Sequence, residues 1–97
     1  PGGASIVMNI TTPTVVKASP GRVAIVRCFP IASGVFGGTT VHNCTTTGAA
    51  TAANKIGELR TVTNSGQDHS INLQTPCDVG IVVLPGNANT ITYVTYT

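Results

Sequence analysis

The sequence predicts an all-β protein with about eight short antiparallel strands in a jelly-roll-like sandwich or barrel. Runs rich in Val, Ile and Thr, whose side chains suit a pleated, half-buried surface, recur along the 97 residues. Gly and Pro separate these runs at short intervals, and no intervening segment has the length of a crossover helix. Closely spaced strands without such helices favour a sandwich or barrel over βαβ units.

Each expected strand is an apolar or Thr-rich run bounded by turn residues. Ser19-Pro20-Gly21 has Pro and Gly at the positions that favour a type II turn, so it is expected to separate the second strand from the third. Residues 75–78 contain a proline and are expected to form a turn after the sixth strand. The expected strands are residues 5–10, 14–18, 22–29, 39–45, 55–62, 70–73, 79–84 and 90–96.

One connecting segment has helical leanings, and the strands differ in which of their faces are apolar. Residues 47–54 have helical leanings but few charges, so we expect a loop with a helical turn there. Residues 22–29 and 79–84 are apolar on both faces, which is typical of a central or interfacial strand. Residues 90–96 alternate polar and apolar side chains, which predicts a strand with one solvent-exposed face.

The composition argues against most kinds of chemistry. Eight of the 97 residues are charged, three acidic and five basic, and the net charge is +2. So few scattered charges provide neither a carboxylate pair for acid–base catalysis nor a basic stripe for nucleic acid. With no Trp and four other aromatic residues, stacking platforms for bases are scarce. No run approaches the ~18 apolar residues of a membrane span. We therefore expect no enzyme and no binding to nucleic acid or membrane.

The candidate metal ligands are poorly spaced. His42 and Cys44 would share one face of a strand, but His69 and Cys77 are not the close pair that a structural zinc site needs. The third cysteine, Cys28, makes the number odd and no CxxC is present, which suggests a reducing site of synthesis. One disulfide with one free thiol stays open. No metal and no cofactor is predicted.

A nucleophilic relay is not predicted either. Asp68-His69-Ser70 contains suitable residue types, but neighbours in an extended chain point to opposite faces and cannot form a relay. A turn accounts for these three residues better. No catalytic residue is therefore assigned.

The composition favours a role in protein–protein contacts over catalysis or metal binding. Residues 1–12 are expected to form a flexible N-terminal arm that adds a strand to a neighbour, and residues 13–97 a single β-sandwich domain. A small domain with a neutral surface gains stability by association, so a homo-oligomer is expected. Apolar residues of the arm, an exposed loop aromatic and two tyrosines of the last strand are the candidate contacts. They are Ile6, Val7, Ile10, Phe36, Tyr93 and Tyr96.

Three stretches resemble small all-β virion proteins of tailed bacteriophages. They read VVKASPGRV at residues 15–23, TTGAATAANKI at 46–56 and PCDVGIVVLPG at 76–86. The resemblance implies a capsid cement or decoration protein that is made in the host bacterial cytoplasm and sits on the capsid surface of the virion. Its implied partners are the major capsid protein and copies of itself, as a trimer or dimer. Residues 30–38 and the cysteine trio depart from the resemblance.

Two alternatives remain open at this point. A tail, neck or head-completion protein would differ in copy number per particle. A small carbohydrate-binding β-sandwich module would need an exposed aromatic platform, for which Phe36, Tyr93 and Tyr96 are the candidates.

Overall fold

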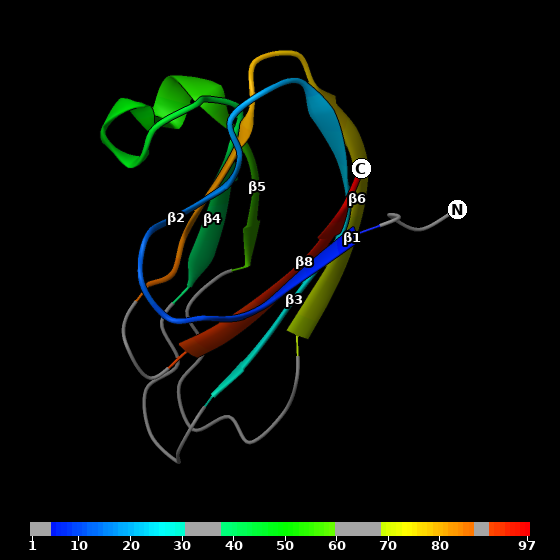
Figure 1. Ribbon diagram of the computed structural model, residues 1–97. Coiled ribbons are helices and arrows are strands. Elements are labelled where there is room, and N and C mark those ends of the chain that lie inside the picture. The colour runs from blue at the N-terminus through cyan, green and yellow to red at the C-terminus, as the bar shows by residue number, and fades with distance from the viewer. Residues whose placement is uncertain (1–4, 31–37, 60–68, 87–89) are drawn as a thin grey trace.

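The computed structural model describes residues 5–30, 38–59, 69–86 and 90–97. Within these ranges the chain forms eight strands and two 3-10 turns, and the strands make two four-stranded antiparallel sheets (Figure 1). The prediction of an all-β sandwich is confirmed. The strands are β1 (Ser5–Ile10), β2 (Thr14–Lys17), β3 (Gly21–Pro30), β4 (Thr39–His42), β5 (Lys55–Leu59), β6 (His69–Cys77), β7 (Ile81–Leu84) and β8 (Thr90–Tyr96); the turns are η1 (Thr47–Ala49) and η2 (Ala52–Asn54).

The pairing of the strands is nested. The first sheet has the order β1-β8-β3-β6 and the second has the order β2-β7-β4-β5. Every strand of the first half therefore pairs antiparallel with its counterpart from the second half, β1 with β8, β2 with β7, β3 with β6 and β4 with β5. In Figure 1 the blue strand β1 and the red strand β8 lie side by side. The chain thus doubles back on itself and the resulting long hairpin is split between two sheets.

The core lies between the two sheets and consists mainly of β-branched side chains. Alternation along each strand points one set of residues inward, and these are fully or almost fully buried. Burying one such side chain stabilises the fold by about 1.5–3 kcal/mol. The fully buried aliphatic residues of this core cluster are Val23, Val26 and Val94 in the first sheet and Val41, Ile81 and Val83 in the second.

A hydroxyl pair crosses this core. Thr39 of β4 and Thr92 of β8 are fully buried, and their Oγ1 atoms lie 3.0 Å apart, within hydrogen-bond distance. The bond joins the two sheets directly. It also lets two threonines sit where valines would otherwise be expected, because each hydroxyl has a partner.

Removing one hydroxyl of this pair is expected to cost more than removing both. Thr92→Val leaves the Thr39 hydroxyl buried without a partner, which should lower the free energy of unfolding by about 1–3 kcal/mol. Thr39→Val together with Thr92→Val restores an apolar contact of the same shape, so most of that loss should be recovered. Urea unfolding of both single variants and the double variant measures the coupling. Additive losses would contradict the bond.

Several boundaries differ from the sequence prediction. Residues 75–78 do not form a turn after a short strand: β6 continues through Pro76 to Cys77, and Pro76 lies opposite Arg22. Proline is tolerated there because β6 is an edge strand of its sheet. The type II turn at Gly21 is also wrong, because Gly21 begins β3 and its φ lies outside the left-handed region that this turn requires.

The fourth strand is shorter than expected. It ends at His42, and the next residue, Asn43, leaves the sheet and donates its backbone N–H to the carbonyl of Asn54 over 2.8 Å. Residues 47–54 form two 3-10 turns, in agreement with the expected loop containing a helical turn.

The expected N-terminal arm is part of the sandwich. Ser5–Ile10 forms β1 and pairs with β8, and residues 1–4 lie outside the described residues. The pairing register shifts between Val7 and Ile10, and Asn9 there has a φ of 60°. This irregularity turns Ile10 inward, where it is 3% exposed.

Candidate contact surface

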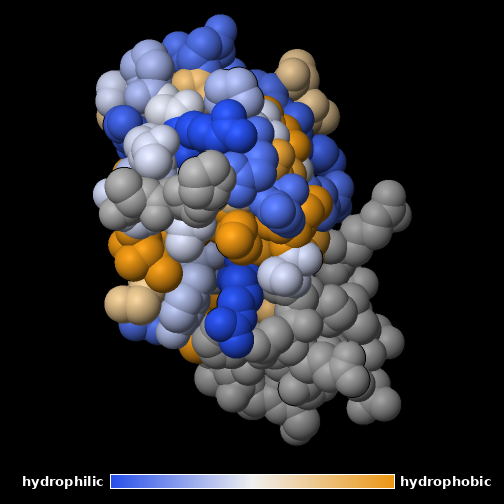
Figure 2. All heavy atoms as spheres, turned by 90° about the vertical axis from the view of Figure 1, so that its right-hand side faces the viewer, coloured by the Kyte–Doolittle hydropathy of each residue, from blue (hydrophilic) through white to orange (hydrophobic). Residues whose placement is uncertain are grey.

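The outer face of the first sheet carries exposed apolar side chains. Strand register places Ile6, Thr95, Ile25 and Asn72 in one row across all four strands. Ile6 is 51% exposed and Ile25 is 38% exposed, and Met8, which follows Ile6 on the same side of β1, is 54% exposed. Figure 2 views the molecule from the side of this sheet and shows apolar residues near its middle beside hydrophilic ones. We call Ile6, Met8, Ile25, Tyr93 and Thr95 the apolar face.

A hydroxyl fixes the centre of the apolar face. The backbone N–H of Ile25 donates to the Oγ1 of Thr95 over 3.0 Å, and this Oγ1 lies 3.4 Å from the carbonyl oxygen of Ile25. The Thr95 side chain therefore satisfies backbone groups of β3 at the irregularity between Val23 and Ile25. The surrounding surface can then stay apolar without unpaired polar groups.

The candidate contact residues do not form one surface. Ile6 and Tyr93 lie on the apolar face, where Tyr93 sits opposite Arg27 in the neighbouring strand. Val7 and Tyr96 are only partly exposed because they pack against the core. Ile10 is buried and cannot serve as a contact in this conformation. Phe36 lies outside the described residues.

Sequence reasoning missed Met8 and Ile25. Both lie on the outer side of their strands, Met8 two residues after Ile6 and Ile25 opposite Thr95. The period-two alternation of residues 5–8 could have identified Met8, because Ile6 and Met8 share one side of an extended strand. The same alternation would place Ile10 beside them, and the irregularity at Asn9 is what separates it.

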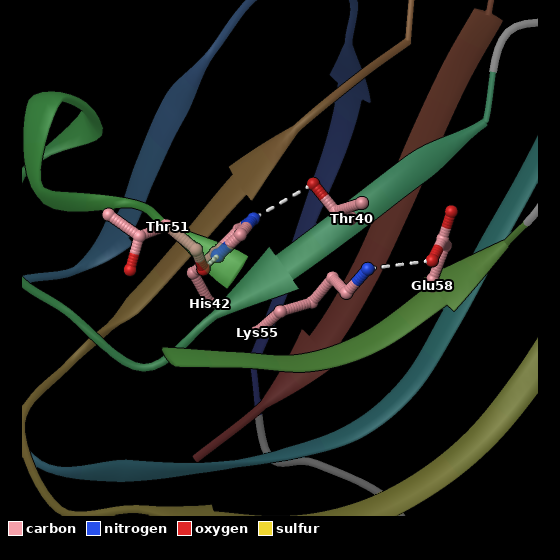
Figure 3. A network of polar contacts seen from close by, with 5 residues as sticks. All are labelled: Thr40, His42, Thr51, Lys55 and Glu58. Carbon is pink, nitrogen blue, oxygen red and sulfur yellow. Dashed lines mark hydrogen bonds and ion pairs between the residues drawn. The ribbon is translucent and has the colours of Figure 1, made fainter. Parts of the chain in front are cut away.

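The outer face of the second sheet is covered locally by the two 3-10 turns. His42 is 4% exposed there and lies opposite Val82, which is fully buried. The His42 Nδ1 lies 2.9 Å from the Thr51 carbonyl oxygen and 3.0 Å from the Asn54 Oδ1, so Nδ1 carries a proton that it donates to both. The Nε2 lies 2.9 Å from the Thr40 hydroxyl (Figure 3). The Nδ1 contacts therefore hold the turns against β4, while Nε2 bonds a hydroxyl of β4 itself.

Loss of this histidine is expected to release the turns. His42→Ala removes three hydrogen bonds and leaves buried space over Val82, so the free energy of unfolding should fall by about 1–3 kcal/mol. The Lys55–Glu58 ion pair in the same view provides the control: its atoms are 2.8 Å apart, but both side chains are more than a third exposed. Lys55→Ala should change stability by less than about 0.5 kcal/mol. Thermal unfolding of the two variants compares them; equal losses would contradict a structural role for His42.

A second polar cluster joins the start of the 43–54 segment to the turn before β7. Asn43 donates through Nδ2 to the carboxylate of Asp78 over 2.7 Å, and its Oδ1 accepts from the backbone N–H groups of Val79 and Gly80. The side chain thus satisfies three groups of the 78–80 turn. Asn43 is therefore occupied in holding the fold together.

The three cysteines are buried and form no disulfide. Burial raises the pKa of the Cys77 thiol above its ordinary value of 9.0, and the negative charge of Asp78 raises it further. The thiol therefore stays protonated at neutral pH and is a poor nucleophile. Within the described ranges no group of three or more His, Cys, Asp or Glu residues could hold a metal ion. Asp68 and the side chain of His69 lie outside the described residues.

No helix within the described residues is long and apolar enough to span a membrane. Comparisons with protein-family models, with curated proteins and with solved structures gave no match. The described residues present an apolar sheet face and structural polar clusters.

Proposed function

We propose that this chain is a non-enzymatic structural protein of a virus particle, a cement or decoration protein that binds the outer capsid shell. Its partner would be the major capsid protein, and it would stabilise contacts between neighbouring shell subunits. The observation that carries the proposal is the nested pairing of eight strands between two four-stranded sheets. This pairing is the connectivity expected of a jelly roll, an architecture common among viral capsid domains.

The surface chemistry supports the same proposal. Fold alone does not specify function, and a binding role also requires a surface suited to the partner. The apolar face has exposed Ile6, Met8 and Ile25 on a rigid sheet. A decoration protein binds through such neutral contacts, and each weak contact is repeated many times by the symmetry of the shell.

The first test is binding to purified shells that lack this protein. Wild-type protein should sediment with the shells. Ile25→Lys places a charge on the apolar face and should weaken binding about tenfold or more, because a lysine buried against a neutral partner loses its hydration. Val15→Lys is the matched control, since Val15 is 40% exposed and lies on the second sheet. Absence of binding, or equal loss in both variants, would contradict the proposal.

Copy number separates this proposal from other positions in the particle. Quantitative mass spectrometry of purified particles should find this chain in a simple ratio to the shell subunits. A few copies per particle would instead support a tail, neck or head-completion protein. Binding to a glycan array that is lost in Tyr93→Ala would support a carbohydrate-binding module.

A further inference from the structure

The four edge strands differ in how well they are protected against pairing with another strand. Among the described residues, β1 and β6 bound the first sheet and β2 and β5 bound the second. Charged residues or proline commonly block such edges. Lys17 lies on β2, Lys55 and Glu58 lie on β5, and Pro76 lies on β6. Strand β1, Ser5–Ile10, contains neither a charge nor a proline.

We propose that β1 is a self-association edge, where two copies of this chain pair β1 with β1 antiparallel about a two-fold axis. The occupant is a second copy because an uncharged strand meets no repulsion from itself, and antiparallel pairing of identical strands is self-complementary. The two first sheets would then become one continuous eight-stranded sheet, four strands from each copy. The proposal goes beyond the proposed capsid role and does not depend on it.

The exposed side chains favour one register. In the described part of the chain, Met8 and Ile6 are the most exposed large hydrophobic residues, at 54% and 51%. If the two-fold axis passes beside Val7, Ile6 lies opposite Met8 of the second copy, and each pair shares the outer side of the sheet. Cross-strand apolar pairs of this kind stabilise sheets, and both residues lose water contact.

The length of the edge limits the strength of the pair. The irregularity at Asn9 bends β1, so regular pairing in this register is limited to residues 6–8 of each copy. So short a strand pair covers less than the ~800 Å² per partner of a stable interface. We therefore expect a concentration-dependent dimer.

Sedimentation equilibrium of wild-type protein from about 10 μM to 1 mM tests the pair, across the range of weak association. The expected mass rises from that of the monomer to that of the dimer. Met8→Lys should raise the dissociation constant of the dimer about tenfold or more. The two copies would then bring two like-charged lysines into the β1–β1 interface. Val79→Lys is the matched control, because Val79 is 45% exposed and lies before β7 in the second sheet. Its dissociation constant should equal that of wild type.

Cross-linking tests the register separately. Under mild oxidation, a mixture of Ile6→Cys and Met8→Cys proteins should form a disulfide-linked heterodimer, whereas each protein alone should form at least several-fold less. The native cysteines are buried and form no disulfide, so they should not contribute. The proposal is overturned by a monomer at all concentrations, by a trimer, by a dimer that Met8→Lys does not weaken, or by homodimer cross-links that equal the heterodimer. A trimer counts against it because two-fold edge pairing closes at two copies.

Discussion

A chain that lacks residues 1–10 is expected to lose its cooperative unfolding transition. The deletion removes β1 and exposes the backbone groups of β8 that pair with it. It also removes Ile10, which is 3% exposed and packs in the core, and emptying a core site of that size costs about 2–5 kcal/mol. Together with the lost strand pairing, this approaches the ~5–15 kcal/mol that stabilises a typical domain.

Circular dichroism during heating measures whether the cooperative unfolding transition is lost. Size-exclusion chromatography detects the aggregation that an exposed β8 edge favours. Deletion of residues 1–4 is the control, because it removes none of β1, and its melting curve should stay close to that of wild type. A cooperative transition near the wild-type temperature in the longer deletion would instead support the flexible arm that the composition of residues 1–12 suggests.

The strands were predictable wherever the local pattern agreed with the pairing. Residues 5–10 and 90–96 were expected as strands and have those bounds, because both have β-forming residues between turn residues. What the local pattern could not supply was the partner of β1. The arm was expected to reach a neighbouring molecule, yet it pairs with β8, at the other end of the described chain. Such long-range pairing is set by the whole fold.

Turn chemistry misled where tertiary position outweighed it. Pro76 favours a turn in isolation, but on the edge strand β6 its missing N–H does not interrupt a ladder. Gly21 favours a type II turn after Pro20, yet it is needed for a different reason. A Cβ on Gly21 would collide with the Thr97 carbonyl oxygen, which comes from the end of the chain. The residues next to Pro76 and Gly21 predict neither the edge position of β6 nor the approach of Thr97.

The candidate surface was predictable to a smaller extent. Ile6 and Tyr93 were identified and do lie on the apolar face, but Ile10 was assigned to the same contact set and is buried. One backbone irregularity at Asn9 decides this, because a single shift in register moves every later side chain to the opposite face. His42 is anchored by Thr51 and Asn54, which come 9 and 12 residues later in the chain. The local sequence pattern did not predict these contacts.

Gly80→Ala is expected to lower the free energy of unfolding by about 3 kcal/mol. Gly80 is buried where three segments meet: a Cβ there would lie 2.8 Å from the Lys17 carbonyl oxygen and closer still to that of Cys44. Both obstacles are backbone, so relief requires the ends of β2 and of the segment after β4 to move. That movement also strains the bond from the Gly80 N–H to Asn43.

The backbone conformation of Gly80 is not itself the obstacle, because its φ lies outside the left-handed region, so the expected loss is steric. Gly48→Ala is the matched control: no atom lies within 4 Å of its added Cβ, and its φ is equally ordinary. Alanine at that exposed site should leave stability unchanged or raise it by up to about 1 kcal/mol, because it restricts the unfolded chain. Urea unfolding of both variants should therefore give shifts of different size. Equal midpoints would mean that Lys17, Cys44 and Gly80 are not packed together as described.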